Sequence, residues 1–161
     1  MLVLAGYVLV GGTLSSANMI TSAQKDMVMQ KEAQMNTAIQ ISEAGFTPYD
    51  ADHNLTFNLQ NTGSNPIFDY NKTDMFISIS QGPPERYSFN GVVSGNTPGS
   101  NTSKTWGYMT ITPDTIHPYM LDPGETMAVK IVDYIIPGSH PIAVVNVTTP
   151  NGITAVGVST F

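Results

Sequence analysis

The residues that could support chemistry are few and stand apart from one another. His53, His117 and His140 each lie beside a turn, and no two have the i, i+4 or short-loop spacing of a metal site. The chain has no cysteine, which excludes disulfides and thiolate metal ligands. Its twelve acidic residues are scattered and show no pairing suited to acid–base catalysis. We therefore expect surface or packing roles for the histidines.

One acidic cluster imitates the opening of a calcium-binding loop. Residues 50–54 read Asp-Ala-Asp-His-Asn, but an EF-hand also needs Gly at its sixth position and Glu at its twelfth. Those positions are Leu55 and Asn61, so a simple turn is expected, with a weak calcium contact as the alternative. The sequence also lacks a Gly-x-Ser-x-Gly elbow and a glycine-rich phosphate loop. No catalytic, cofactor-binding or metal residue is predicted, and an enzyme is not expected.

Four Asn-x-Ser/Thr sequons are the clearest chemical motifs in the chain. None has proline in the middle, so each is a candidate N-glycosylation site on a surface outside the cell. A chain rich in Asn and Thr also produces such triplets by chance. Turn-like surroundings favour two of the four, and the one in a predicted strand is suitable only if its face is solvated. The favoured pair is Asn71 and Asn101, the strand site is Asn146, and the fourth is Asn54.

The charge of the chain argues against nucleic acid as a partner. Six basic and twelve acidic residues give a net charge of -6, whereas phosphate binding needs a basic surface. Only 11% of the 161 residues are charged, against about 25% in an ordinary soluble domain. The surface must therefore be covered by uncharged polar residues or be buried in an assembly.

The elements that position these residues begin with a long N-terminal helix. Residues 1–24 contain no charged side chain, and apolar residues dominate the first ten before recurring at helical spacing. We expect one helix from Leu2 to about Met35, apolar all round at its start and amphipathic towards its end. At 1.5 Å per residue it would be roughly 50 Å long, too long for the interior of a small domain.

Three interpretations of the apolar start remain open. A signal peptide would use a small-residue cleavage site such as Ser15-Ser16-Ala17, but no basic residue precedes the run. A transmembrane anchor needs about 20 apolar residues, and polar residues from Thr13 onward dilute this segment. A helix packed against copies of itself fits the small residues, because Gly12-x-x-x-Ser16 has a spacing that lets helices approach closely. The alternative for the paired glycines is a break in the helix. The expected assembly residues are Leu2, Leu4, Tyr7, Val8, Leu9, Gly11, Gly12, Leu14, Ser16, Met19 and Ile20.

From about residue 36 the sequence predicts a β-domain, so the expected division is a helix at 1–35 and a head at 36–161. Seven or eight short strands with regular turns indicate a mainly-β, immunoglobulin-like β-sandwich. Asn151-Gly152 predicts a hairpin in which both central residues have positive φ, and Phe89–Lys104 reads as a long surface loop. The expected strands are Thr37–Phe46, Leu55–Gln60, Met75–Ser80, Arg86–Phe89, Thr105–Thr112, Met127–Tyr134, Ile142–Thr148 and Ile153–Phe161.

Two of these strands should supply much of the core. Side chains alternate along a strand, which places every second residue on the same face. We expect the two apolar faces to lie opposite each other across the sandwich. These faces are Leu55, Phe57 and Leu59 on one strand and Met127, Val129 and Ile131 on the other.

The arrangement resembles archaeal filament proteins of the type IV pilin superfamily, namely archaellins and the small immunoglobulin-like accessory proteins of the archaellum. Three features carry the resemblance, and together they span most of the chain. They are the uncharged helix running into Gln24-Lys25-Asp26 and Gln30-Lys31-Glu32, the strand and turn Asn58-Leu59-Gln60-Asn61-Thr62-Gly63-Ser64, and the turn Leu121-Asp122-Pro123-Gly124-Glu125.

The resemblance implies an immunoglobulin-like head, export through a class III signal peptide, and a helix that enters a filament core or the membrane. Because no basic signal segment precedes Met1, we expect a processed or truncated chain. The position of the bacterial pilin glutamate holds Ala5. Expected partners are copies of the chain in an extracellular filament that serves motility or adhesion, with membrane contact before assembly. The alternative is a membrane-anchored accessory protein that acts as a stator and whose head binds the surface-layer protein. No cofactor is expected.

Overall fold

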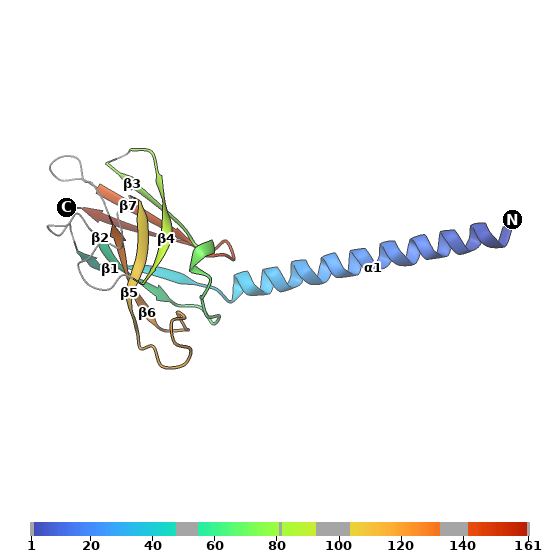
Figure 1. Cartoon of the computed structure of the whole chain (residues 1–161), viewed down its shortest axis with the longest axis horizontal. Coiled ribbons are helices and arrows are strands. Elements are labelled where there is room, and N and C mark those ends of the chain that lie inside the picture. The colour runs from blue at the N-terminus through green and yellow to red at the C-terminus, as the bar shows by residue number, and fades with distance from the viewer. Residues whose placement is uncertain (1, 48–54, 81, 93–103, 133–141, 161) are drawn as a thin grey trace. The chain divides into compact units, whose positions relative to one another are not determined.

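The computed structural model describes residues 2–47, 55–80, 82–92, 104–132 and 142–160. Its contacts divide the chain into two compact units, Met1–Met35 and Asn36–Phe161. The first unit is the single helix α1, Leu2–Met35, drawn in blue in Figure 1. The helix continues through Gly11 and Gly12 without a break, although glycine costs about 1 kcal/mol in a helix interior.

The second unit is the head, and the predicted mainly-β fold behind an N-terminal helix is confirmed. Within the described residues, it contains the short 3-10 helix η1, Tyr70–Lys72, and eight strands. Each predicted strand is present, with ends that differ by a few residues; the predicted ends Tyr134 and Phe161 lie outside the described residues. The strands are β1 Ile39–Thr47, β2 Leu55–Asn61, β3 Asp74–Ile79, β4 Glu85–Val92, β5 Thr105–Thr112, β6 Thr126–Val132, β7 Ile142–Thr148 and β8 Thr154–Thr160.

The eight strands form one sheet in the order β1-β2-β6-β5-β4-β3-β7-β8. Its two end strands, β1 and β8, lie close together, so the sheet nearly closes into a barrel. Strand β4 joins the two halves, because its first residues pair with β3 and its later residues pair with β5. The β4–β5 pair is parallel, whereas the other pairs are antiparallel.

The core faces are as predicted, but their placement across a sandwich is wrong. Leu55, Phe57 and Leu59 are buried and alternate with partly exposed residues along β2. Their partners in β6 lie beside them in the same sheet, since β2 and β6 are hydrogen-bonded neighbours. The paired residues are Leu55 with Ile131, Phe57 with Val129, and Leu59 with Met127. An alternating pattern identifies a buried face and leaves open which strand lies next to it.

Two local predictions also need correction. The strand β4 continues to Val92, beyond the expected end at Phe89, through a bulge at Gly91 with φ of 86°. The β7–β8 hairpin forms, but of its Asn-Gly pair only Gly152 has positive φ. The chain turns over Thr149 to Gly152, where the Gly152 N–H donates to the Thr149 carbonyl at 2.8 Å. The longer loop removes the need for positive φ at Asn151.

Candidate assembly surfaces

The described part of α1 carries large apolar side chains that nothing in its own unit covers. Met19, Ile20, Met27, Val28, Met29 and Met35 are all exposed. Among the predicted assembly residues, Ser16, Met19 and Ile20 have described side chains, and each is exposed. The structure gives only the helical backbone for those from Leu2 to Leu14.

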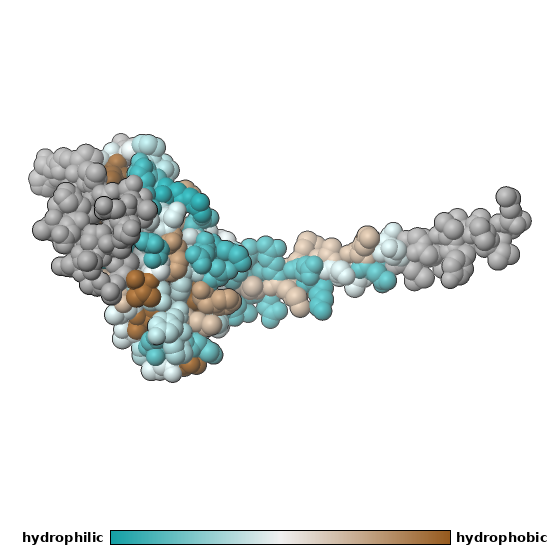
Figure 2. Space-filling model, viewed as in Figure 1, coloured by the Kyte–Doolittle hydropathy of each residue, from teal (hydrophilic) through white to brown (hydrophobic). Residues whose placement is uncertain are grey.

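The predicted amphipathic end of the helix is wrong. Successive helical residues point about 100° apart, so the exposed Met27, Val28 and Met29 project in three directions. Figure 2 shows apolar and polar residues interspersed along this part of the helix. A helix without one apolar stripe is not suited to lying on a single flat surface, and partners on several sides are needed to bury its apolar groups.

Two turns that stand far apart in the sequence meet at Asn61 in the head. The Asn61 side-chain amide donates to the carbonyls of Asn65 and Leu121, each at 2.8 Å, and its carbonyl oxygen accepts from the Gly63 N–H at 3.0 Å. Its backbone N–H donates to the Glu125 carbonyl, and its backbone carbonyl accepts from Gly124. Asn61 is fully buried, so these bonds satisfy polar groups that would otherwise be costly to bury.

The same turn holds the first residues of the head. The N–H groups of Thr62 and Gly63 donate to the Ala38 carbonyl, and those of Ser64 and Asn65 donate to the Asn36 carbonyl. From the β7–β8 hairpin, Asn151 donates to the Thr37 hydroxyl at 2.9 Å. Residues 36–38 therefore serve as hydrogen-bond partners for the 62–65 turn, and β1 begins at Ile39 rather than at the predicted Thr37.

His117 is the one histidine within the described residues, and it has a structural partner. Its Nδ1 lies 3.0 Å from the buried Asp122 carboxylate, which also accepts from the His117 backbone N–H. Across the described residues, no three His, Asp or Glu side chains gather as a metal site would require. His53, His140, Asp50 and Asp52 lie outside the described residues, so the calcium alternative is not tested.

Two of the four sequons can be placed. Asn71 is exposed on η1. Beside it, Lys72 forms an ion pair with Asp69 at 2.7 Å, and this hydrogen bond raises the pKa of Lys72. Asn146 lies on β7 between buried Val145 and Val147, so its side chain is on the outer face of the sheet. Asn54 and Asn101 lie outside the described residues.

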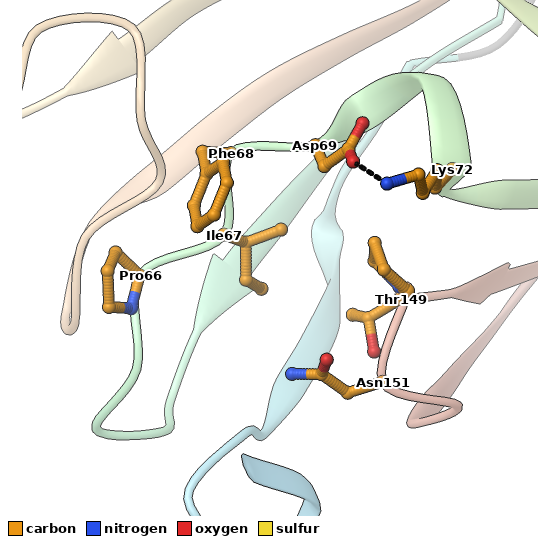
Figure 3. A pocket seen from close by; sticks show the side chains of 8 residues that line it. Pro66, Ile67, Phe68, Asp69, Lys72, Thr149 and Asn151 are labelled. Carbon is orange, nitrogen blue, oxygen red and sulfur yellow. Dashed lines mark ion pairs between the residues drawn. The ribbon is translucent and has the colours of Figure 1, made fainter. Parts of the chain in front are cut away.

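A small pocket lies between η1 and the β7–β8 hairpin. Figure 3 shows Pro66, Ile67 and Phe68 on one side of it and Thr149 and Asn151 on the other, with the Asp69–Lys72 ion pair at its rim. Its volume is about 250 Å³, below the roughly 300–1,000 Å³ typical of small-molecule sites.

The chain thus consists of a long N-terminal helix with exposed apolar side chains, followed in the sequence by a mainly-β head. The chain belongs to the archaeal-type flagellin family, whose pattern it matches over residues 1–158. It is therefore a structural protein of the archaellum filament class and not an enzyme. No curated protein sequence matches it significantly. Over the described residues, no helix has both the length and the apolarity needed to cross a membrane.

Three solved structures share the fold at low sequence identity. The archaeal flagellum of Methanospirillum hungatei strain JF1 is 14% identical, with a TM-score of 0.61 over 99% of this chain and 90% of that chain. Archaeal flagellin FlaB1 from Methanocaldococcus jannaschii is 13% identical, with a TM-score of 0.54 over 76% and 90% of the two chains. The archaellum periplasmic stator protein FlaG from Sulfolobus acidocaldarius is 18% identical, with a TM-score of 0.54 over 76% and 99%.

Proposed function

We propose that this chain is the subunit of an extracellular filament and polymerises with copies of itself through α1. The observation that carries the proposal is the set of exposed Met, Ile and Val side chains on several sides of the described helix. Neighbouring helices would remove these groups from water, and each buried side chain would contribute about 1.5–3 kcal/mol. Residues 1–35 would then form the assembly helix, and residues 36–161 the outer head.

The absence of charge in residues 1–24 supports the same proposal. A helix surrounded by copies of itself places identical residues near each other. A charged residue there would be buried close to the same charge on a neighbouring copy, which would destabilise the assembly. Gly11, Gly12 and Ser16 would let the helix backbones approach closely. The apolar residues from Leu2 to Leu14 would fill the space between them.

Electron microscopy of the purified full chain tests this proposal. We expect filaments from the unaltered chain, single particles from a chain lacking residues 1–23, and no filaments from Gly12→Leu, whose larger side chain would keep helices apart. Gly12→Ala is the matched control and should still assemble. Filaments of unchanged form from the truncated chain would show that contacts between heads drive assembly.

The alternative function is a membrane-anchored accessory protein whose head binds the surface layer. The likeness to the archaellum periplasmic stator protein FlaG favours it only at the level of the fold. The partner of the helix separates the two functions, because a filament subunit buries α1 against copies of itself and an anchor buries it in lipid. Flotation with lipid vesicles, without filaments under any condition, would favour the anchor.

We also propose that Asn71 carries an N-linked glycan. Its side chain is exposed, whereas Asn146 is partly covered in the centre of a strand. Mass spectrometry of the protein from its native host tests this, with Thr73→Ala as the variant that removes the Asn71 sequon. An unmodified Asn71 peptide in a sample with other modified sequons would contradict the proposal.

A further inference from the structure

The loop after β5 displays two large apolar side chains on a braced backbone. Ile116 and Tyr119 are 69% and 68% exposed. Tyr119 has φ of 70°. This is a left-handed backbone conformation, which is energetically unfavourable for a residue other than glycine. Strain of this kind persists only where the surrounding structure imposes it.

Hydrogen bonds from both sides impose this conformation. The Tyr119 N–H donates to the Asp114 carboxylate at 3.1 Å, and the Tyr119 carbonyl accepts from the Tyr70 hydroxyl at 3.2 Å. The loop is closed by Met120 N–H donating to the His117 carbonyl, and the Asp122 carboxylate holds His117. The loop thus holds Ile116 and Tyr119 in a fixed backbone arrangement before contact, which lowers the entropy cost of binding a partner.

A second apolar surface lies on the outer face of the β7–β8 hairpin. Val156 is 57% exposed and Val158 is 47% exposed, and the register places Val158 beside Val144 and Val156 beside Asn146. Residues 142–160 contain no charged side chain.

The charge distribution of the head indicates which partner the outer β7–β8 face contacts. Ten of the twelve acidic residues and four of the six basic residues lie in residues 36–161, so the whole net charge of -6 is on the head. Two heads therefore repel each other, and an uncharged face is where they approach at least cost. The loop carries Asp114, and residues 142–160 offer no charged side chain that would oppose its carboxylate.

Resting on the proposed function, we infer that the 113–120 loop of one copy docks on the outer β7–β8 face of the next copy in the filament. The loop joins β5 to β6, and β4 and β3 separate β5 from β7 in the sheet, so loop and face are different surfaces of one head. A contact between different surfaces is heterologous and continues from copy to copy as an open polymer.

The contact is too small to hold two heads together alone, since stable interfaces bury about 1,200–2,000 Å². The contact forms once the helices have brought the heads together, because tethering raises the effective concentration of one head near the next. The occupant of the β7–β8 face is thus a second copy within the same filament, and the loop adds to assembly that α1 begins.

Cross-linking in assembled filaments tests the contact directly, because the chain has no cysteine of its own. We expect Ile116→Cys with Val156→Cys, treated with a short bis-maleimide, to give a ladder of dimers, trimers and longer chains in a denaturing gel. Each single variant should remain monomeric, as should the control pair Asn71→Cys with Val156→Cys. Intact filaments without a ladder would overturn the inference, and so would dimers from Ile116→Cys alone or an equal ladder from the control pair.

Tyr119→Gly provides an independent measurement. Glycine adopts φ of 70° without strain, so the head should melt no earlier than the unaltered head. Loss of the aromatic ring should make subunits leave the filament about tenfold faster or more, as expected for a contact residue. An unchanged dissociation rate would overturn the inference. Failure of the unaltered chain to form filaments would instead refute the proposed function.

Discussion

Gly63→Ala should destabilise the head far more than the addition of one methyl group suggests. A Cβ at this position would lie 2.4 Å from the Ala38 nitrogen and 2.6 Å from the Asn36 carbonyl oxygen. Both are backbone atoms, so no side chain can rotate out of the way. An ordinary Cβ contact begins at 3.4 Å, and residues 36–38 would have to move by about 1 Å.

That movement would disturb four backbone hydrogen bonds from residues 62–65 to Ala38 and Asn36, which now measure 2.8–3.1 Å. Loss of two of them costs about 2 kcal/mol, and overpacking adds about 1–3 kcal/mol. Alanine lowers the conformational entropy of the unfolded chain, which stabilises the folded head by about 0.4–1 kcal/mol. The expected loss is therefore about 3 kcal/mol, a large share of the usual 5–15 kcal/mol stability of a domain.

Urea unfolding followed by tryptophan fluorescence measures this loss. Trp106 is the only tryptophan and is fully buried beside Phe89, so its emission reports unfolding of the head. The chain lacking residues 1–23 is the background, since assembly then does not contribute. Gly91→Ala is the matched control: Gly91 has φ of 86° and nothing within 4 Å of its Cβ position, so strain alone should cost about 1 kcal/mol. A loss at Gly63 no greater than at Gly91 would refute the steric argument.

Three further predictions concern the core, alkaline pH and metal. Phe57→Ala should cost about 3–5 kcal/mol because Phe57 is buried between Leu55 and Leu59. Thr56→Ala, on the other face, should cost less than half as much in urea unfolding of unglycosylated protein. Burial raises the pKa of Tyr70 and of Tyr108; their contribution to stability is complete below the unfolded value of about 10 and is lost as pH rises above it. The melting temperature should therefore be constant from neutral pH to about 9 and fall at higher pH. An equal fall of the melting temperature in Tyr108→Phe would exclude Tyr108 as a cause. Chelator should leave the melting temperature unchanged, whereas a fall of about 10 °C would indicate an ion bound at Asp50 and Asp52.

The choice of elements followed from local sequence patterns. The absence of charge in residues 1–24 and the apolar residues at helical spacing from Leu14 to Val28 were sufficient to predict α1 at its observed bounds. Strict alternation in Leu55–Gln60 predicted that Leu55, Phe57 and Leu59 of β2 are buried. Such patterns are local because the helical and extended conformations each repeat over a few residues. The family resemblance likewise rested on short segments that can be read along the chain.

The sequence could not predict the partners of these elements. Nothing in the alternation of β2 or β6 shows that they are neighbours in one sheet, or that β4 and β5 pair in parallel. Asn61 and Glu125 stand 64 positions apart, yet their backbones bond at 3.0 Å. These contacts depend on how strands of similar pattern compete for the same core, and each strand's own sequence is compatible with several neighbours.

The sequence alone determined a neutral helix, an acidic head and the uncharged stretch at residues 142–160, because charge and apolarity are properties of residues. Only the tertiary structure decided that this stretch displays Val156 and Val158 on an outer face while Ile116 and Tyr119 project from a different surface. Exposure is not a local property, since a valine in a strand is buried or solvated according to what the rest of the chain packs against it.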